Sequence, residues 1–208
     1  MKYKWYALKL VLICAIIFFF QLNFPNLTDE FALISAEVFY KPWTIVTYIF
    51  LHGSVLHIVY NMFALGLFGS TLESIIGGKK FLILFFISGI VAGIGSVLFY
   101  NASIGASGAV YGIFGALAVL RPRMTVYMGY GFPMPLVLAV TLWAIGDFIG
   151  LFAPTEVAYA AHLFGLAFGL IYGFSLRKQF GEKKKRRTKV YDIGEKEFED
   201  WENEWMFT

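Results

Sequence analysis

The sequence has few charged residues and only one cysteine. Asp, Glu, Lys and Arg make up 15% of its 208 residues, whereas soluble domains carry about 25%. The lone Cys14 has no partner within the chain, which excludes a small secreted domain held by internal disulfides. The shortage of charge excludes a soluble globular enzyme and a disordered regulator.

Apolar residues are in excess. They make up 59% of the chain, or about 123 positions, and six membrane helices of about 20 residues need about 120. The apolar runs cover 6–24, 43–70, 81–101, 107–120, 134–152 and 158–176. The first run is too long for a signal peptide and no small-residue cleavage site follows it. We therefore predict an all-α membrane protein with a bundle of six transmembrane helices.

The basic residues orient these helices. With six spans, every one of the 17 Lys and Arg residues except Lys41 lies on the same side. The positive-inside rule then places both termini in the cytoplasm, and we expect a multi-pass protein of a bacterial inner (plasma) membrane. We divide the chain into a membrane domain, 1–176, and a cytoplasmic tail, 177–208. The basic run 183–187 is expected to contact anionic lipid head groups rather than nucleic acid.

A few polar residues interrupt the apolar runs, and they fall at a similar depth. Ser107 lies about 21 Å from the cytoplasmic end of its run, in a hydrocarbon core of about 30 Å. The fourth helix is therefore predicted to be short and recessed. His162, Asn61 and His57 lie about 18–24 Å from the cytoplasmic ends of their own runs. These four residues predict a water-accessible site near the outer surface.

A serine and a histidine at one depth favour nucleophilic catalysis, because a serine hydroxyl needs an adjacent base to become a strong nucleophile. Ser107 is the candidate nucleophile and His162 the candidate base, although in isolation the first could be a helix N-cap and the second a core histidine. The flanking Gly105 and Gly108 allow a tight turn and close packing. At the start of a helix, the backbone amide of Ser107 can also donate to a developing oxyanion.

Two further patterns support this site. His57 and Asn61 lie at positions i and i+4 of one helix, so both can supply donors to one point, although interhelical hydrogen bonding is an alternative role. Small residues recur every four positions in 107–120 and 158–176. Such faces let helix backbones approach closely, as a hydrogen bond between Ser107 and His162 requires.

With these residues, the chain resembles the rhomboid intramembrane serine proteases along almost its whole six-span length. The motifs are His52-x4-His57-x3-Asn61, Gly105-x-Ser107-Gly108 and Ala161-His162-x2-Gly165-x3-Gly169. The resemblance implies a six-helix rhomboid-like bundle whose short fourth helix carries the nucleophile.

The resemblance also implies roles for single residues. Ser107 is the nucleophile and His162 the general base, in a dyad with no carboxylate as third member. His57, Asn61 and the amide of Ser107 stabilise the oxyanion, and Tyr111 packs against His162. No cofactor or metal is implied, and the substrates are single-span membrane proteins cleaved near the outer face.

One departure from the family concerns the first loop. In the family's fold this loop, here about 25–42, lies partly in the outer leaflet. Trp43-Thr44 stands where many members have Trp-Arg. The departure bears on how the loop is anchored and not on the catalytic chemistry.

Several alternatives stay open. His52 is expected to support the site, with a direct catalytic role as the second reading. Asp147 is either a structural hydrogen-bond acceptor or the carboxylate of a triad. A single membrane aspartate does not fit an aspartyl protease, and a zinc-binding His-Glu-x-x-His is missing from the sequence. The competing functions are a catalytically silent rhomboid-like protein that binds or retains membrane clients, and a small transporter.

Overall fold

The computed structural model describes residues 4–24, 26–128, 131–153 and 157–182, and these are mainly helical, as predicted. Of the predicted tail, 177–180 form the end of the last described helix, while the basic run 183–187 and residues 188–208 lie outside the described residues. The α-helices are α1 (Tyr6–Asn23), α2 (Asn26–Phe31), α3 (Thr44–Thr47), α4 (Val55–Ala64), α5 (Ser70–Ile76), α6 (Gly78–Phe99), α7 (Ser107–Leu120), α8 (Leu136–Gly150) and α9 (Tyr159–Phe180). A 3-10 turn, η1 (Tyr48–Phe50), follows α3, and a π-helical turn, η2 (Leu65–Gly69), joins α4 to α5.

Within the described residues, four helical segments are long and apolar enough to cross a membrane. They are Tyr6–Asn23, Val55–Ile76, Gly78–Phe99 and Tyr159–Phe180, while α7 and α8 are apolar but shorter. The chain is therefore a multi-pass membrane protein. The count of six spans stays a prediction, because α7 and α8 fall below the length that a full crossing requires.

The second helix differs from its predicted range of 43–70. The first part of that range forms α3 and η1, and the backbone then becomes extended at Leu51. Ser54 caps the new helix α4 by accepting the His57 backbone N–H at 3.1 Å. The helix then continues through η2 and α5 to Ile76. Gly53 and the capping residue Ser54 interrupt the apolar run at this break, and the predicted range ran through them.

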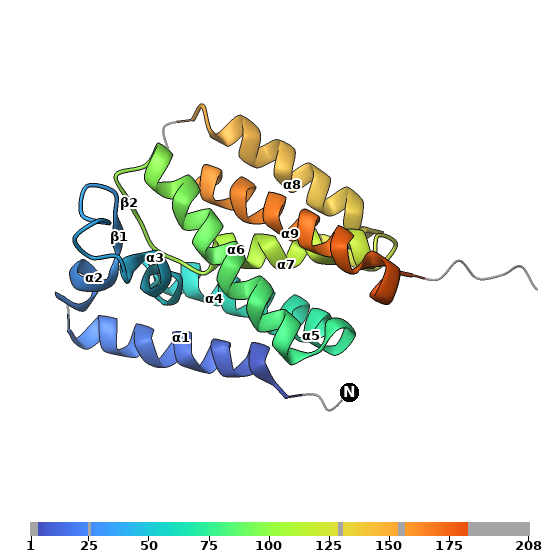
Figure 1. Cartoon of the computed structure of the whole chain (residues 1–208), viewed down its shortest axis with the longest axis horizontal. Coiled ribbons are helices and arrows are strands. Elements are labelled where there is room, and N and C mark those ends of the chain that lie inside the picture. Colours follow the sequence, from blue (N-terminus) through green and yellow to red (C-terminus); the bar gives the residue numbers. More distant parts are fainter. Residues whose placement is uncertain (1–3, 25, 129–130, 154–156, 183–208) are drawn as a thin grey trace, which may run out of the picture.

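A short two-stranded sheet closes one end of the bundle. Strand β1 (Leu33–Ile34) pairs antiparallel with β2 (Ala102–Ser103), which places the first loop beside the segment that leads into α7. These strands lie with α2 and α3 at the end of the bundle away from the N-terminus (Figure 1). The second sheet is a hairpin of β3 (Thr125–Met128) and β4 (Phe132–Pro135), between α7 and α8.

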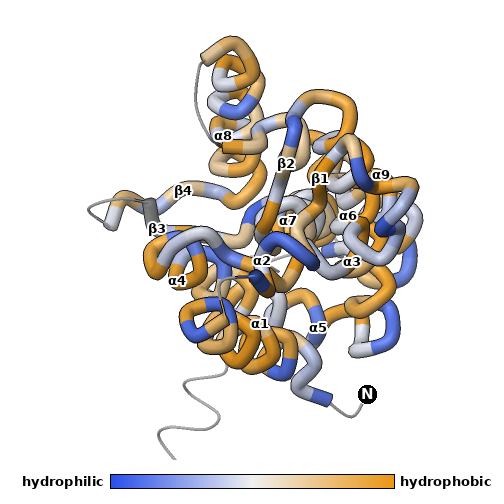
Figure 2. The backbone as a smooth tube through the Cα atoms, turned by 90° about the vertical axis from the view of Figure 1, so that its left-hand side faces the viewer, coloured by the Kyte–Doolittle hydropathy of each residue, from blue (hydrophilic) through white to orange (hydrophobic). Residues whose placement is uncertain are grey.

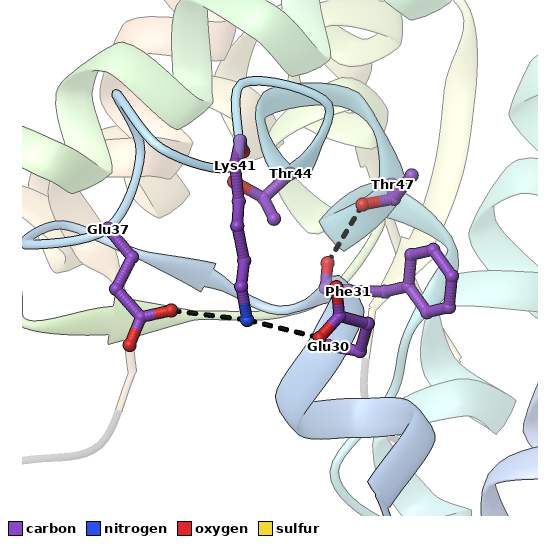
Figure 3. Close-up of polar contacts among 6 residues, drawn as sticks. All are labelled: Glu30, Phe31, Glu37, Lys41, Thr44 and Thr47. Carbon is purple, nitrogen blue, oxygen red and sulfur yellow. Dashed lines mark hydrogen bonds and ion pairs between the residues drawn. The ribbon is translucent and has the colours of Figure 1, made fainter.

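The first loop is anchored by its own polar contacts (Figure 3). Lys41 Nζ lies 3.1 Å from a Glu30 carboxylate oxygen and 3.3 Å from one of Glu37. The hydroxyl of Thr44 donates to the Lys41 carbonyl, and that of Thr47 donates to the Phe31 carbonyl. With threonine at position 44, these contacts tie the loop together.

The opposite end of the bundle gathers basic residues. Arg121 donates to the carbonyls of Leu120 and Phe180, which satisfies a carbonyl at the C-terminus of α9. Lys80 lies over the ring of Phe180, 5.7 Å from its centroid. The basic side chains after α5 and after α7 therefore meet at the end where α9 finishes.

Helix α7 is the centre of the bundle. Twelve of its 14 residues are buried, and it packs mainly against α6 and α9. Helices α1 and α8 lie on opposite edges of the bundle in both ribbon and tube views (Figures 1 and 2). Figure 2 shows hydrophobic residues along the helices and hydrophilic residues at α2. Large apolar side chains are exposed on the two edge helices, among them Phe19 of α1 and Phe148 of α8, as contact with lipid requires.

The contact between α7 and α9 is a backbone contact. A side chain at Gly165 would collide with the Gly108 carbonyl, and one at Gly169 with the Gly112 carbonyl. A Cβ at Gly173 would lie 2.9 Å from the Cα of Ala116. The predicted small-residue faces are therefore the faces that meet, and they bring the two helix axes close together.

Glu73 fixes α1 to the rest of the bundle. Its side chain is buried, and its two carboxylate oxygens accept the backbone N–H groups of Tyr6 at 3.1 Å and Ala7 at 3.0 Å. A carboxylate at this position satisfies free amides of the first turn and complements the positive end of the helix dipole.

The glycine contact predicts a stability difference between two substitutions. In Gly169→Val, the new side chain would overlap with the Gly112 peptide group of α7. The overlap can be relieved only if α7 and α9 move apart. We expect it to lower the free energy of unfolding by about 3 kcal/mol, measured by denaturation in detergent micelles. Gly146→Ala, where an added Cβ meets nothing within 4 Å, is the matched control and is expected to be neutral or slightly stabilising. Equal stability of the two variants would contradict the close contact.

Candidate active site

Ser107 is positioned by the chain that leads into α7. Gly105 has a φ of +125°, a conformation that residues with a Cβ rarely adopt. Its backbone N–H donates to the Tyr48 carbonyl at 2.9 Å, which joins this turn to η1. The turn ends at Ser107, the first residue of α7, so the serine amide is one of the free amides of that helix.

The side chains of Ser107 and His162 contact each other across α7 and α9. His162 Nε2 lies 2.9 Å from the Ser107 hydroxyl oxygen. Tyr111, one turn after Ser107, stacks on the imidazole with ring centroids 4.3 Å apart and an angle of 12° between the planes. His162 is buried and Ser107 is half-buried, so the hydroxyl is the more accessible member of the pair.

Asp147 of α8 contacts the other side of the imidazole. One of its carboxylate oxygens lies 3.1 Å from His162 Nδ1, and both side chains are largely shielded from solvent. The family resemblance implied a serine and histidine without a carboxylate, so this contact differs from that expectation. Of the two alternatives that the sequence left open for Asp147, the geometry fits the triad position.

His57 and Asn61 direct polar groups toward the same region. The Gly53 backbone N–H lies 3.4 Å from His57 Nδ1, so this nitrogen accepts and Nε2 carries the proton. A Cβ on Gly105 would lie 2.8 Å from His57 Nε2, which shows how close the ring is to the turn before Ser107. Asn61 is buried and its amide donates to the His57 carbonyl at 2.9 Å, with its second N–H left for another acceptor.

His52 packs against His57. It is buried, and its ring packs edge-on against that of His57, with centroids 5.0 Å apart. Burial is the main reason why the pKa of His52 is lowered to about 4, although the nearby Phe50 carbonyl opposes this shift. His52 is therefore neutral at neutral pH. Among the described residues it does not line the cavity below, which fits a supporting position.

A cavity of about 940 Å³ opens over these residues. Ser107, His162, His57, Asn61 and Tyr111 all line it. Its volume is within the range of sites that hold small molecules or peptide segments. Ser107 therefore lines an open cavity and not a closed part of the bundle.

The structure brings together the residues that the sequence singled out. Ser107, His162, His57 and Asn61 come from three helices and line one cavity. The sequence left the role of Asp147 open between two alternatives, because only the rotation of α8 about its own axis decides which side chain Asp147 contacts. Within the described ranges, no group of three or more His, Cys, Asp or Glu side chains is arranged to hold a metal ion.

Comparison with known proteins identifies the family. A family model described as Rhomboid domain matches residues 40–179. Rhomboid protease GlpG of Yersinia pseudotuberculosis serotype I (strain IP32953) is 30% identical over 179 residues, or 81% of this chain and 61% of that protein. The putative rhomboid protease YdcA of Bacillus subtilis (strain 168) is 28% identical over 135 residues, 64% of this chain and 66% of that protein.

These comparisons agree with the motifs read from the sequence. The chain spans about 61% of the length of the GlpG relatives that it matches. The matched region contains α4, α7 and α9, which carry the serine, the histidines and the asparagine of the candidate site. The chain therefore belongs to the rhomboid family.

Proposed function

We propose that this protein is an intramembrane serine endopeptidase that cleaves single-span membrane proteins near the outer leaflet. The observation that carries the proposal is the hydrogen bond between His162 Nε2 and the Ser107 hydroxyl, inside a cavity lined by further donors. Membership of the rhomboid family and similarity to named rhomboid proteases add independent support.

The first chemical step is acylation of Ser107. Its oxygen attacks the carbonyl carbon of the substrate peptide bond while its proton passes to His162 Nε2. Collapse of the tetrahedral intermediate breaks the C–N bond, and His162 returns the proton to the leaving amine. Water then attacks the acyl-enzyme by the same route, with His162 again acting first as base and then as acid.

The oxyanion of this intermediate needs donors that are already in position. We assign this role to the backbone amide of Ser107, the Nε2–H of His57 and the free N–H of Asn61. The amide lies at the N-terminus of α7, where the helix dipole also favours negative charge. Gly105 keeps the turn close to His57 because no side chain separates them.

A topology with six spans and both termini in the cytoplasm accounts for the charge distribution. Lys80, Arg121 and the end of α9 meet at one end of the bundle. Lys41 lies in the first loop, which β1 and β2 hold beside the segment leading into Ser107. In this topology α7 is a recessed helix, since its 14 residues extend about 21 Å in the centre of the bundle. The cavity then faces the outer side.

Removal of the nucleophile tests the function directly. Ser107→Ala is expected to abolish cleavage of a single-span substrate in liposomes and labelling by a fluorophosphonate probe, because no other group supplies the attacking oxygen. Wild-type protein labelled at Ser107, with labelling lost in His162→Ala, would assign both roles. Ser175→Ala on α9, where the hydroxyl bonds only to the Tyr172 carbonyl of its own helix, serves as the control and is expected to keep activity.

Cleavage by Ser107→Ala at the wild-type rate would overturn the mechanism. Client binding by both proteins with cleavage by neither would support the hypothesis of a catalytically silent rhomboid-like protein.

Removal of a single oxyanion donor is predicted to slow the reaction without abolishing it. Asn61→Ala and His57→Ala each remove one donor, so each is expected to lower kcat by about 10²–10³-fold. Their effect on substrate affinity is expected to be small, because the donors act on charge that develops only in the transition state. Steady-state cleavage assays with both variants measure this. A change confined to KM would instead indicate that these residues bind the ground-state substrate.

A further inference from the structure

The contact between Asp147 and His162 has a chemical role that the family resemblance does not imply. Asp147 lies on α8, 15 residues before His162 on α9, and the two side chains meet between these helices. The carboxylate is 3.1 Å from Nδ1, on the side of the ring opposite to Ser107. The three groups thus form one continuous chain from carboxylate to imidazole to hydroxyl.

We propose that Asp147 is the positioning residue of a Ser107–His162–Asp147 triad. This inference rests on the proposed protease function. A neutral histidine carries its proton on one nitrogen only, and a carboxylate accepts but does not donate. Asp147 therefore holds the proton of His162 on Nδ1. The lone pair of Nε2 is then free to take the proton of Ser107, which is what a general base must do.

The membrane surroundings strengthen this role. When Ser107 attacks, His162 becomes positively charged inside a bundle with apolar outer faces, where an isolated charge is costly. A carboxylate in contact with the ring stabilises that charge, since attraction between opposite charges is stronger where water is scarce. Asp147 itself is buried, so its carboxylate needs a hydrogen-bond donor, and His162 Nδ1 supplies one.

Tyr111 fixes the ring from a second direction. Its ring stacks on the face of His162, with centroids 4.3 Å apart. Asp147 therefore orients the imidazole in its plane, through Nδ1, and Tyr111 supports the face of the ring. Asp147 is not among the cavity-lining residues, so it acts through His162 and not by contact with substrate.

The first experiment measures the tautomer in the unaltered protein. The chain contains only three histidines, so protein labelled with ¹⁵N-histidine in detergent micelles gives few signals, and His162→Ala assigns the relevant pair. We expect Nδ1 of His162 to carry the proton at a pH where the ring is neutral. A neutral His162 protonated on Nε2 would overturn the proposal, and this measurement does not depend on a variant that must fold.

The second experiment uses Asp147→Asn, which keeps the size of the side chain and removes its charge. We expect kcat for a single-span substrate in liposomes to fall by about 10²–10⁴-fold with little change in KM. Reaction of Ser107 with a fluorophosphonate probe is expected to slow in parallel. Thr141→Val is the matched control, because Thr141 lies on the same helix with its hydroxyl bonded to the Val137 carbonyl. It is expected to retain wild-type kcat.

The outcomes separate this inference from the proposed function. If Asp147→Asn cleaves at the wild-type rate while Ser107→Ala is inactive, the triad is wrong and the protease function stands. If Ser107→Ala also cleaves, the function itself fails. A merely structural Asp147 would lower the thermal stability of Asp147→Asn but leave kcat and the tautomer of His162 unchanged.

Discussion

The close approach of α7 and α9 is the constraint on which the site depends. Backbone lies against backbone at Gly165 and Gly169, because even one methyl group would collide with the carbonyls of α7. Only at this separation does the imidazole of His162 reach the hydroxyl of Ser107 at 2.9 Å. In a membrane, where lipid gives no hydrophobic drive for helices to associate, such tight van der Waals packing holds helices together. The contacts that stabilise the bundle therefore also set the catalytic distance.

Much of this arrangement is local enough to be predicted from the sequence. The apolar runs predict membrane helices, the small residues spaced by four predict the packing faces, and helix rise places Ser107 and His162 at similar depth. Each of these inferences uses periodicity or length, which a single sequence contains. Gly105, two residues before Ser107, also favours a tight turn, and its backbone has a positive φ that other residues rarely adopt.

The features that could not be predicted are set by contacts between distant segments. The break at 51–54 has only a short signal in Gly53 and Ser54, and it is fixed because Ser54 caps α4 and Gln21 accepts the His52 backbone N–H. Strands β1 and β2 are only two residues long, so neither shows the alternation that marks a strand. The contact of Asp147 with His162 depends on the rotation of α8, since a residue's depth along a helix says nothing about which neighbour it faces.

The polar groups of the site satisfy one another before any substrate arrives. Asp147 is matched with His162, His162 with Ser107, and Asn61 with the His57 carbonyl. This pairing lets ionisable and polar side chains stay inside a bundle with apolar outer faces at acceptable cost. Three donors of the described site remain, the second N–H of Asn61, Nε2–H of His57 and the amide of Ser107, and in the proposed mechanism they bind the developing oxyanion. In such a protein, the few hydrogen-bond donors left unpaired beside an open cavity are the first candidates for a chemical role.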